Sequence, residues 1–130
     1  MALRRARVLV AEDDDAMRAM LTEEFQRRGF EVVTVKTGRE LWHQLSHAAQ
    51  TDDLHRPFDA VVSDVRMPGR TGLDVLAELR ESNWSVPVFL ITGFGEDWIH
   101  REGDRLGASV LDKPVDLDRL VCAVREATAA

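Results

Sequence analysis

The chain has 130 residues, of which 45% are hydrophobic and 31% are charged, and its formal net charge is −6. This length predicts a single domain, residues 1–130 with a core at about 6–127, and the composition is too apolar for a disordered chain. The acidic balance argues against a nucleic-acid-binding protein, because such proteins depend on Lys and Arg placed against phosphates. The single cysteine, Cys122, excludes an internal disulfide framework.

Short runs rich in β-branched residues alternate along the chain with stretches of helical periodicity. In chain order, the predicted elements are a strand at Val8–Ala11, a helix from Asp14 or Asp15, a strand at Val32–Val35, a helix from near Thr37, a strand at Ala60–Ser63, a helix after Thr71-Gly72, a strand at Val88–Ile91, a helix from near Asp97, a strand at Val110–Leu111 and a helix from about Asp116. This repeated strand–helix order predicts an α/β fold with a parallel sheet, right-handed crossovers and helices on both faces.

The sequence also predicts the burial of several side chains and the structure of one polar segment. Cys122, on the last helix, is interpreted as a small packing residue, and Trp98 is expected to be partly buried. The polar stretch 46–57 predicts an extended helix end and a long loop before the third strand. The first helix is expected to bury an apolar stripe made of Met17, Met20, Leu21 and Phe25.

Polar side chains gather where the predicted strands end, and ligands bind at the carboxyl ends of the strands in an open α/β sheet. After the first, third, fourth and fifth strands, these positions hold Glu12-Asp13-Asp14-Asp15, Asp64, Thr92 and Lys113. Each residue alone has a structural explanation, such as carboxylates placed at the start of a helix. Together they predict a metal-assisted phosphoryl site, because crowded carboxylates require a cation such as Mg²⁺ and a lysine ammonium suits a phosphoryl group.

Four motifs, in this order and spacing, resemble the receiver domain of bacterial two-component response regulators over nearly the whole chain. They are Val8–Asp13, Ser63–Gly69 with Gly72 behind it, Leu90–Gly93 and Asp112–Pro114. The resemblance implies a doubly wound (βα)5 fold with a five-stranded parallel sheet in the flavodoxin-like order 2-1-3-4-5. The interval between the first two motifs is longer than is usual in the family, and the stretch 46–57 accounts for the difference.

The resemblance also implies roles for residues of the first two motifs. Asp64 is implied as the phospho-acceptor, a carboxylate nucleophile that forms an aspartyl phosphate. Glu12 and Asp13 resemble the acidic pair that binds Mg²⁺. Asp64 itself and the backbone carbonyl of Arg66 would complete the protein ligands.

In the later motifs, Thr92 resembles the switch hydroxyl that bonds to the phosphoryl group, and Lys113 resembles the lysine that pairs with it. Pro114 is expected to follow a cis peptide bond. Phosphorylation would then shift the surface formed by the last two predicted helices and the strand between them, and a partner or output domain would read this surface.

The sequence departs from the family at Val110, which stands where an aromatic switch residue is usual, and Phe94 or Trp98 is a candidate to replace it. Arg66 and Phe94 flank the implied acceptor, where the family tunes dephosphorylation. Because both side chains are bulky, we expect slow self-hydrolysis of the phosphoryl group. A half-life of only seconds for the isolated phosphorylated protein would contradict this expectation.

The upstream partner implied by the resemblance is a sensor histidine kinase or a phosphotransfer protein, and a small donor such as acetyl phosphate would substitute for it. No apolar run is long enough to cross a membrane, and we expect no direct contact with membrane or nucleic acid. The expected protein is a cytoplasmic signalling switch, a monomer or weak homodimer. It would catalyse its own phosphorylation and slow dephosphorylation rather than a metabolic reaction.

Two other functions stay open at this point. A small phosphatase of similar fold also forms an aspartyl phosphate, but it needs a second Asp two residues after the nucleophile, where this chain has Arg66. A receiver-like interaction module that works without phosphorylation is favoured only by Val110.

Overall fold

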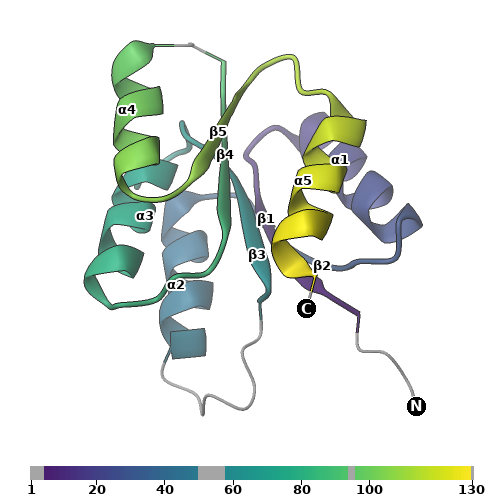
Figure 1. The fold of residues 1–130 in the computed structure, drawn as a ribbon, viewed down its shortest axis with the longest axis horizontal. Coiled ribbons are helices and arrows are strands. Elements are labelled where there is room, and N and C mark those ends of the chain that lie inside the picture. The colour runs from purple at the N-terminus through teal and green to yellow at the C-terminus, as the bar shows by residue number, and fades with distance from the viewer. Residues whose placement is uncertain (1–4, 50–57, 94–95, 130) are drawn as a thin grey trace.

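The computed structural model describes residues 5–49, 58–93 and 96–129. Over these residues the predicted alternation of strands and helices is confirmed (Figure 1). The elements are β1 (Arg7–Ala11), α1 (Asp15–Arg27), β2 (Glu31–Val35), α2 (Gly38–Ala49), β3 (Ala60–Asp64), α3 (Gly72–Glu81), β4 (Val88–Thr92), α4 (Asp97–Arg105), β5 (Ser109–Asp112) and α5 (Leu117–Thr128). None of the helices in this described part is long and apolar enough to span a bilayer. The long loop predicted after α2 falls on residues 50–57, outside the described residues, and stays a prediction.

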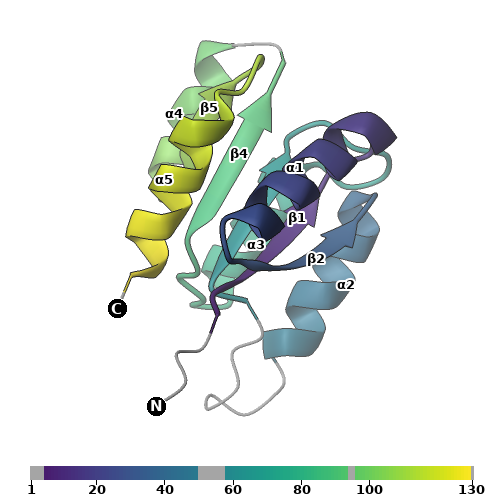
Figure 2. The same cartoon turned by 90° about the vertical axis from the view of Figure 1, so that its right-hand side faces the viewer.

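The strands form one parallel sheet in the order β2-β1-β3-β4-β5, which confirms the predicted fold class. β1 has a neighbour on each side, because Val10 pairs with Thr34 of β2 and also with Val62 of β3. α1 and α5 cover one face of the sheet, whereas α2, α3 and α4 cover the other (Figure 1, Figure 2). The helices therefore lie on both faces, as in a doubly wound fold.

The core consists of two apolar clusters, one on each face of the sheet. Strands that are covered on both faces send alternate side chains into the two clusters. In β1, Leu9 packs into the cluster beneath α2, α3 and α4, whereas Val10 packs into the cluster beneath α1 and α5. The second cluster also holds Phe25 and Phe30, whose rings meet edge to face with their centroids 5.4 Å apart.

Arg80 ties two loops together at the end of the sheet where the strands begin. Its guanidinium donates hydrogen bonds to the backbone carbonyls of Leu106 at 2.6 Å, Trp84 at 2.9 Å and Val86 at 3.0 Å. Leu106 caps the C-terminal end of α4, whereas the other two residues lie between α3 and β4. One side chain of α3 therefore fixes the C-terminal end of α4.

Two side chains are more exposed than the sequence analysis predicted. Met20 is 44% exposed, so the burial predicted for it is wrong, whereas Trp98, for which partial burial is predicted, is 50% exposed. Cys122 is also exposed, and the packing role predicted for it is wrong. Met20 and Cys122 are direct neighbours of the buried residues Leu21 and Val121, and a rotation of about 100° per residue turns them away from the sheet.

Candidate functional site

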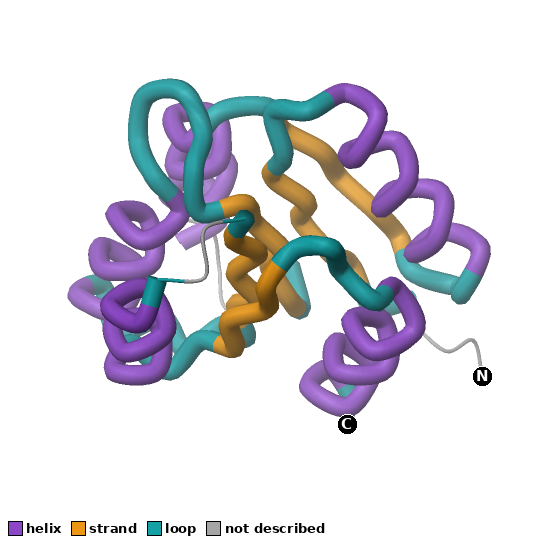
Figure 3. The backbone as a smooth tube through the Cα atoms, turned by 90° about the horizontal axis from the view of Figure 1, so that it is seen from above, coloured by secondary structure: helices purple, strands orange, loops and turns teal. Residues whose placement is uncertain are grey.

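The strand ends bring the predicted site residues together at one edge of the sheet. Glu12 and Asp13 directly follow β1, Asp64 and Thr92 are the last residues of β3 and β4, and Lys113 directly follows β5. Because the strands are parallel, all of these positions share the edge that Figure 3 shows from above. Residues that are far apart in the sequence are thus neighbours in the fold.

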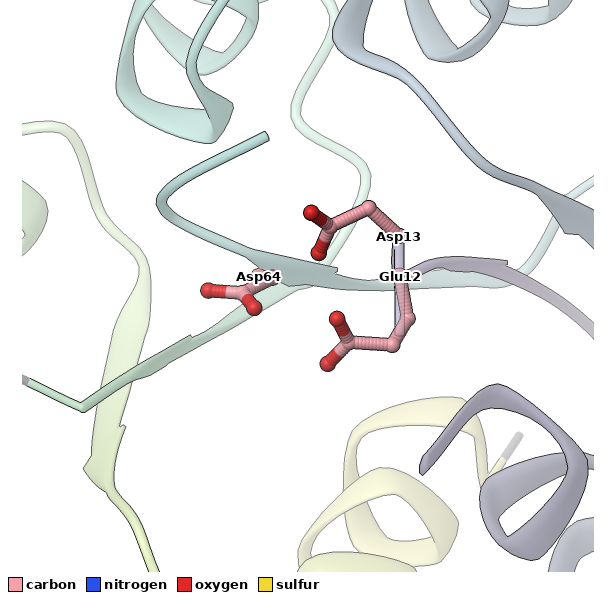
Figure 4. Close-up of side chains that lie close together, drawn as sticks. All are labelled: Glu12, Asp13 and Asp64. Atoms are coloured by element: carbon pink, nitrogen blue, oxygen red, sulfur yellow. The ribbon is translucent and has the colours of Figure 1, made fainter. Parts of the chain in front are cut away.

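Three carboxylates crowd this edge. One oxygen from each of Glu12, Asp13 and Asp64 lies within 4.8 Å of the other two, and Figure 4 shows these side chains converging from the ends of β1 and β3. Glu12 is 1% exposed and Asp64 is 6% exposed, whereas Asp13 is open to solvent. Carboxylates at this separation repel one another unless a cation shares the space.

Lys113 places a positive charge among these carboxylates. Its Nζ lies 2.9 Å from Oδ2 of Asp64 and 3.7 Å from Oε1 of Glu12. Burial alone would lower the pKa of the Lys113 ammonium, but its hydrogen bond to Asp64 and the nearby carboxylate charges together raise this pKa above the ordinary value of 10.5. The backbone N–H of Lys113 donates to the Thr92 carbonyl at 2.8 Å, and the bond between Lys113 and Pro114 is cis. The lysine is therefore held beside β4 by its own backbone.

One carboxylate oxygen of Glu12 has no hydrogen-bond partner among the residues that the structure describes. Oε2 accepts a hydrogen bond from the backbone N–H of Asp14 at 3.2 Å, whereas Oε1 is buried and accepts none. A buried polar atom without a partner is unfavourable. Hard divalent cations prefer oxygen ligands of this kind, so the donor set of Glu12, Asp13 and Asp64 fits Mg²⁺.

Arg66 links this edge of the sheet to α4. Its backbone N–H donates to Oδ1 of Asp64 at 3.2 Å, and its Nη2 lies 3.4 Å from Oε1 of Glu96, the residue before α4. Glu96 in turn accepts a hydrogen bond from the indole N–H of the exposed Trp98. The sequence alone does not predict these contacts, because ion pairs between residues 30 positions apart leave no periodic signal.

Val110, which replaces the expected aromatic residue, packs against α4. A Cβ atom built on Gly103 would lie only 2.4 Å from Cγ2 of Val110. The close approach of α4 and β5 therefore depends on glycine, which has no side chain, at position 103. Gly103 weakens the helical pattern of the sequence, and this contact gives it a packing reason. Phe94 lies outside the described residues, so its part in the switch stays a prediction.

The buried carboxyl of Glu12 predicts a pH dependence of stability. Burial raises the pKa of the Glu12 carboxyl to about 7 from the ordinary 4.5, and the charge of Asp64 adds to this effect, although the Asp14 N–H opposes it. At a pH between 4.5 and about 7, the Glu12 carboxyl is therefore protonated in the folded protein and ionised in the unfolded chain. The free energy of unfolding of the metal-free protein should therefore fall by about 1–3 kcal/mol as the pH rises from about 5 to 8, measured by urea titration in EDTA.

The matched variant is Glu12→Gln, which keeps the side-chain volume and removes the titrating group. Its unfolding free energy should depend less steeply on pH than that of the wild type. Added Mg²⁺ should stabilise the wild type more at high pH than at low pH, because the ion displaces the proton. Parallel pH profiles for the two proteins would show that this carboxyl does not titrate in the range.

Comparison with known proteins agrees with this geometry. The sequence model described as response regulator receiver domain matches residues 8–125. The chain is 35% identical over 122 residues to the regulatory protein AtoC of Escherichia coli, which covers 93% of this chain and 25% of AtoC. It is 33% identical over 125 residues to the transcriptional regulatory protein PdtaR of Mycobacterium tuberculosis, covering 95% of this chain and 57% of PdtaR. The chain thus spans between a quarter and somewhat more than half of these relatives.

Solved structures support the same assignment. The receiver domain of the Francisella response regulator 1452 is similar with a TM-score of 0.84 at 25% identity, covering 95% of this chain and 97% of that one. The chemotaxis protein CheY4 of Vibrio cholerae is similar with a TM-score of 0.79 at 28% identity, covering 95% of this chain and 99% of that one. With a family model that matches nearly its full length, the chain belongs to the response regulator receiver domain family.

Proposed function

We propose that this chain is the phospho-accepting part of a two-component phosphorelay, in which Asp64 takes a phosphoryl group from a histidine kinase or a phosphotransfer protein and Mg²⁺ is required. The surroundings of the Asp64 carboxylate carry the proposal. The ammonium of Lys113 contacts it at 2.9 Å, and Glu12 and Asp13 place their oxygens close enough to share a cation with it. This combination of charges suits the transfer of a phosphoryl group to a carboxylate.

Asp64 is the nucleophile in this proposal. One oxygen of its carboxylate attacks phosphorus, the P–N bond of a phosphohistidine breaks, and the leaving imidazole takes up a proton. A bound Mg²⁺ would supply charge neutralisation for the phosphoryl oxygens. Lys113 stabilises the same charge with a fixed ammonium. The hydroxyl of Thr92, buried at the end of β4, is the proposed donor to the attached phosphoryl group.

The surface formed by α4, β5 and α5 is the proposed output. Phosphorylation adds about two negative charges close to Arg66, whose guanidinium pairs with Glu96 at the start of α4. Competition between the phosphoryl group and Glu96 for this arginine would alter how α4 is held, by a route that needs no aromatic residue at position 110.

The proposed protein is a cytoplasmic switch, a monomer or weak homodimer. Its reader is a downstream domain or partner protein, and the length of the relatives beyond the matched region supports this role.

The test is the uptake of one phosphoryl group. The purified protein is incubated with Mg²⁺ and acetyl phosphate, and its intact mass is measured beside that of a known receiver domain treated in parallel. We expect a gain of one phosphoryl mass with Mg²⁺ and none in EDTA. Hydroxylamine should remove the adduct, because it cleaves acyl phosphates and leaves phosphate esters intact. An unchanged mass, when the known receiver is phosphorylated, would contradict the proposal.

A further inference from the structure

We infer that Arg18 is a positioning residue for the acidic pair. Its guanidinium fixes the peptide between Glu12 and Asp13 and thereby directs both carboxylates toward a shared Mg²⁺. This inference rests on the proposed function, because it concerns the affinity of the same site for the ion. Arg18 lies outside every motif that points to the site in the sequence.

Arg18 reaches back from the first turn of α1 to the end of β1. Its Nη1 donates to the backbone carbonyl of Glu12 at 3.0 Å, and its Nη2 donates to Oδ1 of Asp15 at 2.5 Å. The Arg18 side chain is only 15% exposed. A planar guanidinium that is held by two acceptors and covered by the fold has little freedom to move.

Three hydrogen bonds hold Glu12 in place, and its carboxylate oxygen Oε1 takes part in none of them. Its N–H donates to the Val35 carbonyl at 3.1 Å, its own carbonyl accepts from Arg18, and its Oε2 accepts from the Asp14 N–H at 3.2 Å. The remaining oxygen, Oε1, is the buried one without a hydrogen-bond partner among the described residues. Of the three bonds, the one from Arg18 is the only one made by a side chain of another residue, so a substitution can remove it without changing the backbone.

The carbonyl of Glu12 lies before the helix, and the helix does not hold it. The backbone N–H of Arg18 donates to the carbonyl of Asp14 at 2.9 Å, two residues after Glu12. Without the guanidinium, the Glu12–Asp13 peptide loses the bond that opposes its rotation, and the carboxylates attached on either side turn with it. Mg²⁺ demands near-ideal octahedral geometry, so such a rotation lowers its affinity.

The direction in which the Mg²⁺ affinity changes when Arg18 is removed distinguishes a positioning role from an effect of its charge. Arg18 is a cation beside a cation site, so by charge alone its removal should strengthen Mg²⁺ binding. Positioning predicts the opposite result. Outer groups that orient the ligands of a metal typically contribute about 10–100-fold to its affinity.

The experiment compares Arg18→Met, Arg18→Lys and Asp15→Asn with the wild type. Calorimetry measures the Mg²⁺ dissociation constant, and phosphorylation by acetyl phosphate is followed at several Mg²⁺ concentrations. Arg18→Met should raise the dissociation constant about tenfold and raise the Mg²⁺ concentration for half-maximal rate, with a much smaller loss of the rate at saturating Mg²⁺. Arg18→Lys should recover part of the affinity, because an ammonium still donates toward the carbonyl. Asp15→Asn should stay near the wild type, because Asp15 is 83% exposed and does not contact Glu12 through this bond.

Each outcome decides the inference. A folded Arg18→Met protein that binds Mg²⁺ as tightly as the wild type, or more tightly, would overturn it. Equal weakening by Asp15→Asn would also overturn it, because the ion pair would then matter rather than the bond to the carbonyl. If Arg18→Met does not fold, Arg18→Gln, whose amide is too short to reach the carbonyl, is judged by the same criterion. A wild type that binds no Mg²⁺ and takes up no phosphoryl group would refute the proposed function instead.

Discussion

Replacing Asp64 with asparagine will reduce phosphoryl uptake from acetyl phosphate to below detection. A neutral amide is a poor nucleophile and cannot form an acyl phosphate. The Asp64 carboxylate accepts from the Arg66 N–H on Oδ1 at 3.2 Å and from the Lys113 ammonium on Oδ2 at 2.9 Å, and the single amide oxygen of asparagine can replace only one of these acceptors. The loss of the other hydrogen bond opposes the relief of repulsion among the carboxylates of Glu12, Asp13 and Asp64, so the free energy of unfolding should change by no more than about 2 kcal/mol. Intact mass and urea unfolding measure the two effects separately.

Asp59 provides the matched control for this substitution. It directly precedes β3, at the end of the strand opposite Asp64, and its Oδ2 accepts from the Arg7 N–H at 2.8 Å. Asp59→Asn should therefore keep its phosphoryl uptake. Full uptake by Asp64→Asn would identify a different acceptor, and an equal loss in both variants would remove the argument for Asp64.

Gly38→Ala should lower the free energy of unfolding by at least about 2 kcal/mol. A Cβ atom at Gly38 would lie 1.8 Å from the backbone oxygen of Arg70, and the Gly38 N–H donates to the carbonyl of Pro68 at 3.4 Å. Because the obstructing atom belongs to the backbone, no change of rotamer can relieve the clash. In an exposed helix interior the same substitution stabilises by about 1 kcal/mol, so the sign of the change is informative.

The substitution should also weaken Mg²⁺ binding, because the displaced loop after β3 carries the backbone carbonyl of Arg66, which is a proposed ligand of the ion. Gly93→Ala is the control for stability, since a Cβ there would make an ordinary contact at 3.6 Å from Cδ of Lys113. Urea unfolding of both variants measures the difference. If the Gly38→Ala protein is as stable as the wild type, α2 and the loop that carries Arg70 can move apart without lowering the free energy of unfolding, and the prediction is wrong.

Much of the fold could be predicted because each local pattern had one physical meaning. An apolar run that stops at Asp64 or at Thr92 marks the end of a buried strand, and parallel strands put their ends at one edge. The sequence therefore predicts that Glu12 and Asp64 share one edge of the sheet, and the structure adds that both carboxylates are buried. The order of the strands in the sheet could be predicted only from the family resemblance. The alternation of strands and helices predicts that the strands are parallel, but it does not predict which strands are adjacent.

The remaining contacts depend on backbone positions that no sequence pattern encodes. The bond from Arg18 to the carbonyl of Glu12 requires the path of the chain between β1 and α1. The approach of Gly38 to Arg70 joins two loops that are distant in the sequence. The helical pattern predicts which face of α1 is buried only to within about one residue. It therefore predicts burial for Met20 as well as for its neighbour Leu21, although only Leu21 is buried.

The polar contacts at the two ends of helix α4 differ in strength. Arg80 binds the carbonyl of Leu106 at its C-terminal cap, whereas near its N-terminal end the ion pair between Arg66 and Glu96 is exposed to solvent. Exposed ion pairs are weak and give way to a stronger competitor. We therefore expect a change of charge at this edge of the sheet to move the exposed side chain of Trp98, whereas Leu106 keeps its position and the buried Ile99 keeps the first turn of α4 in the core.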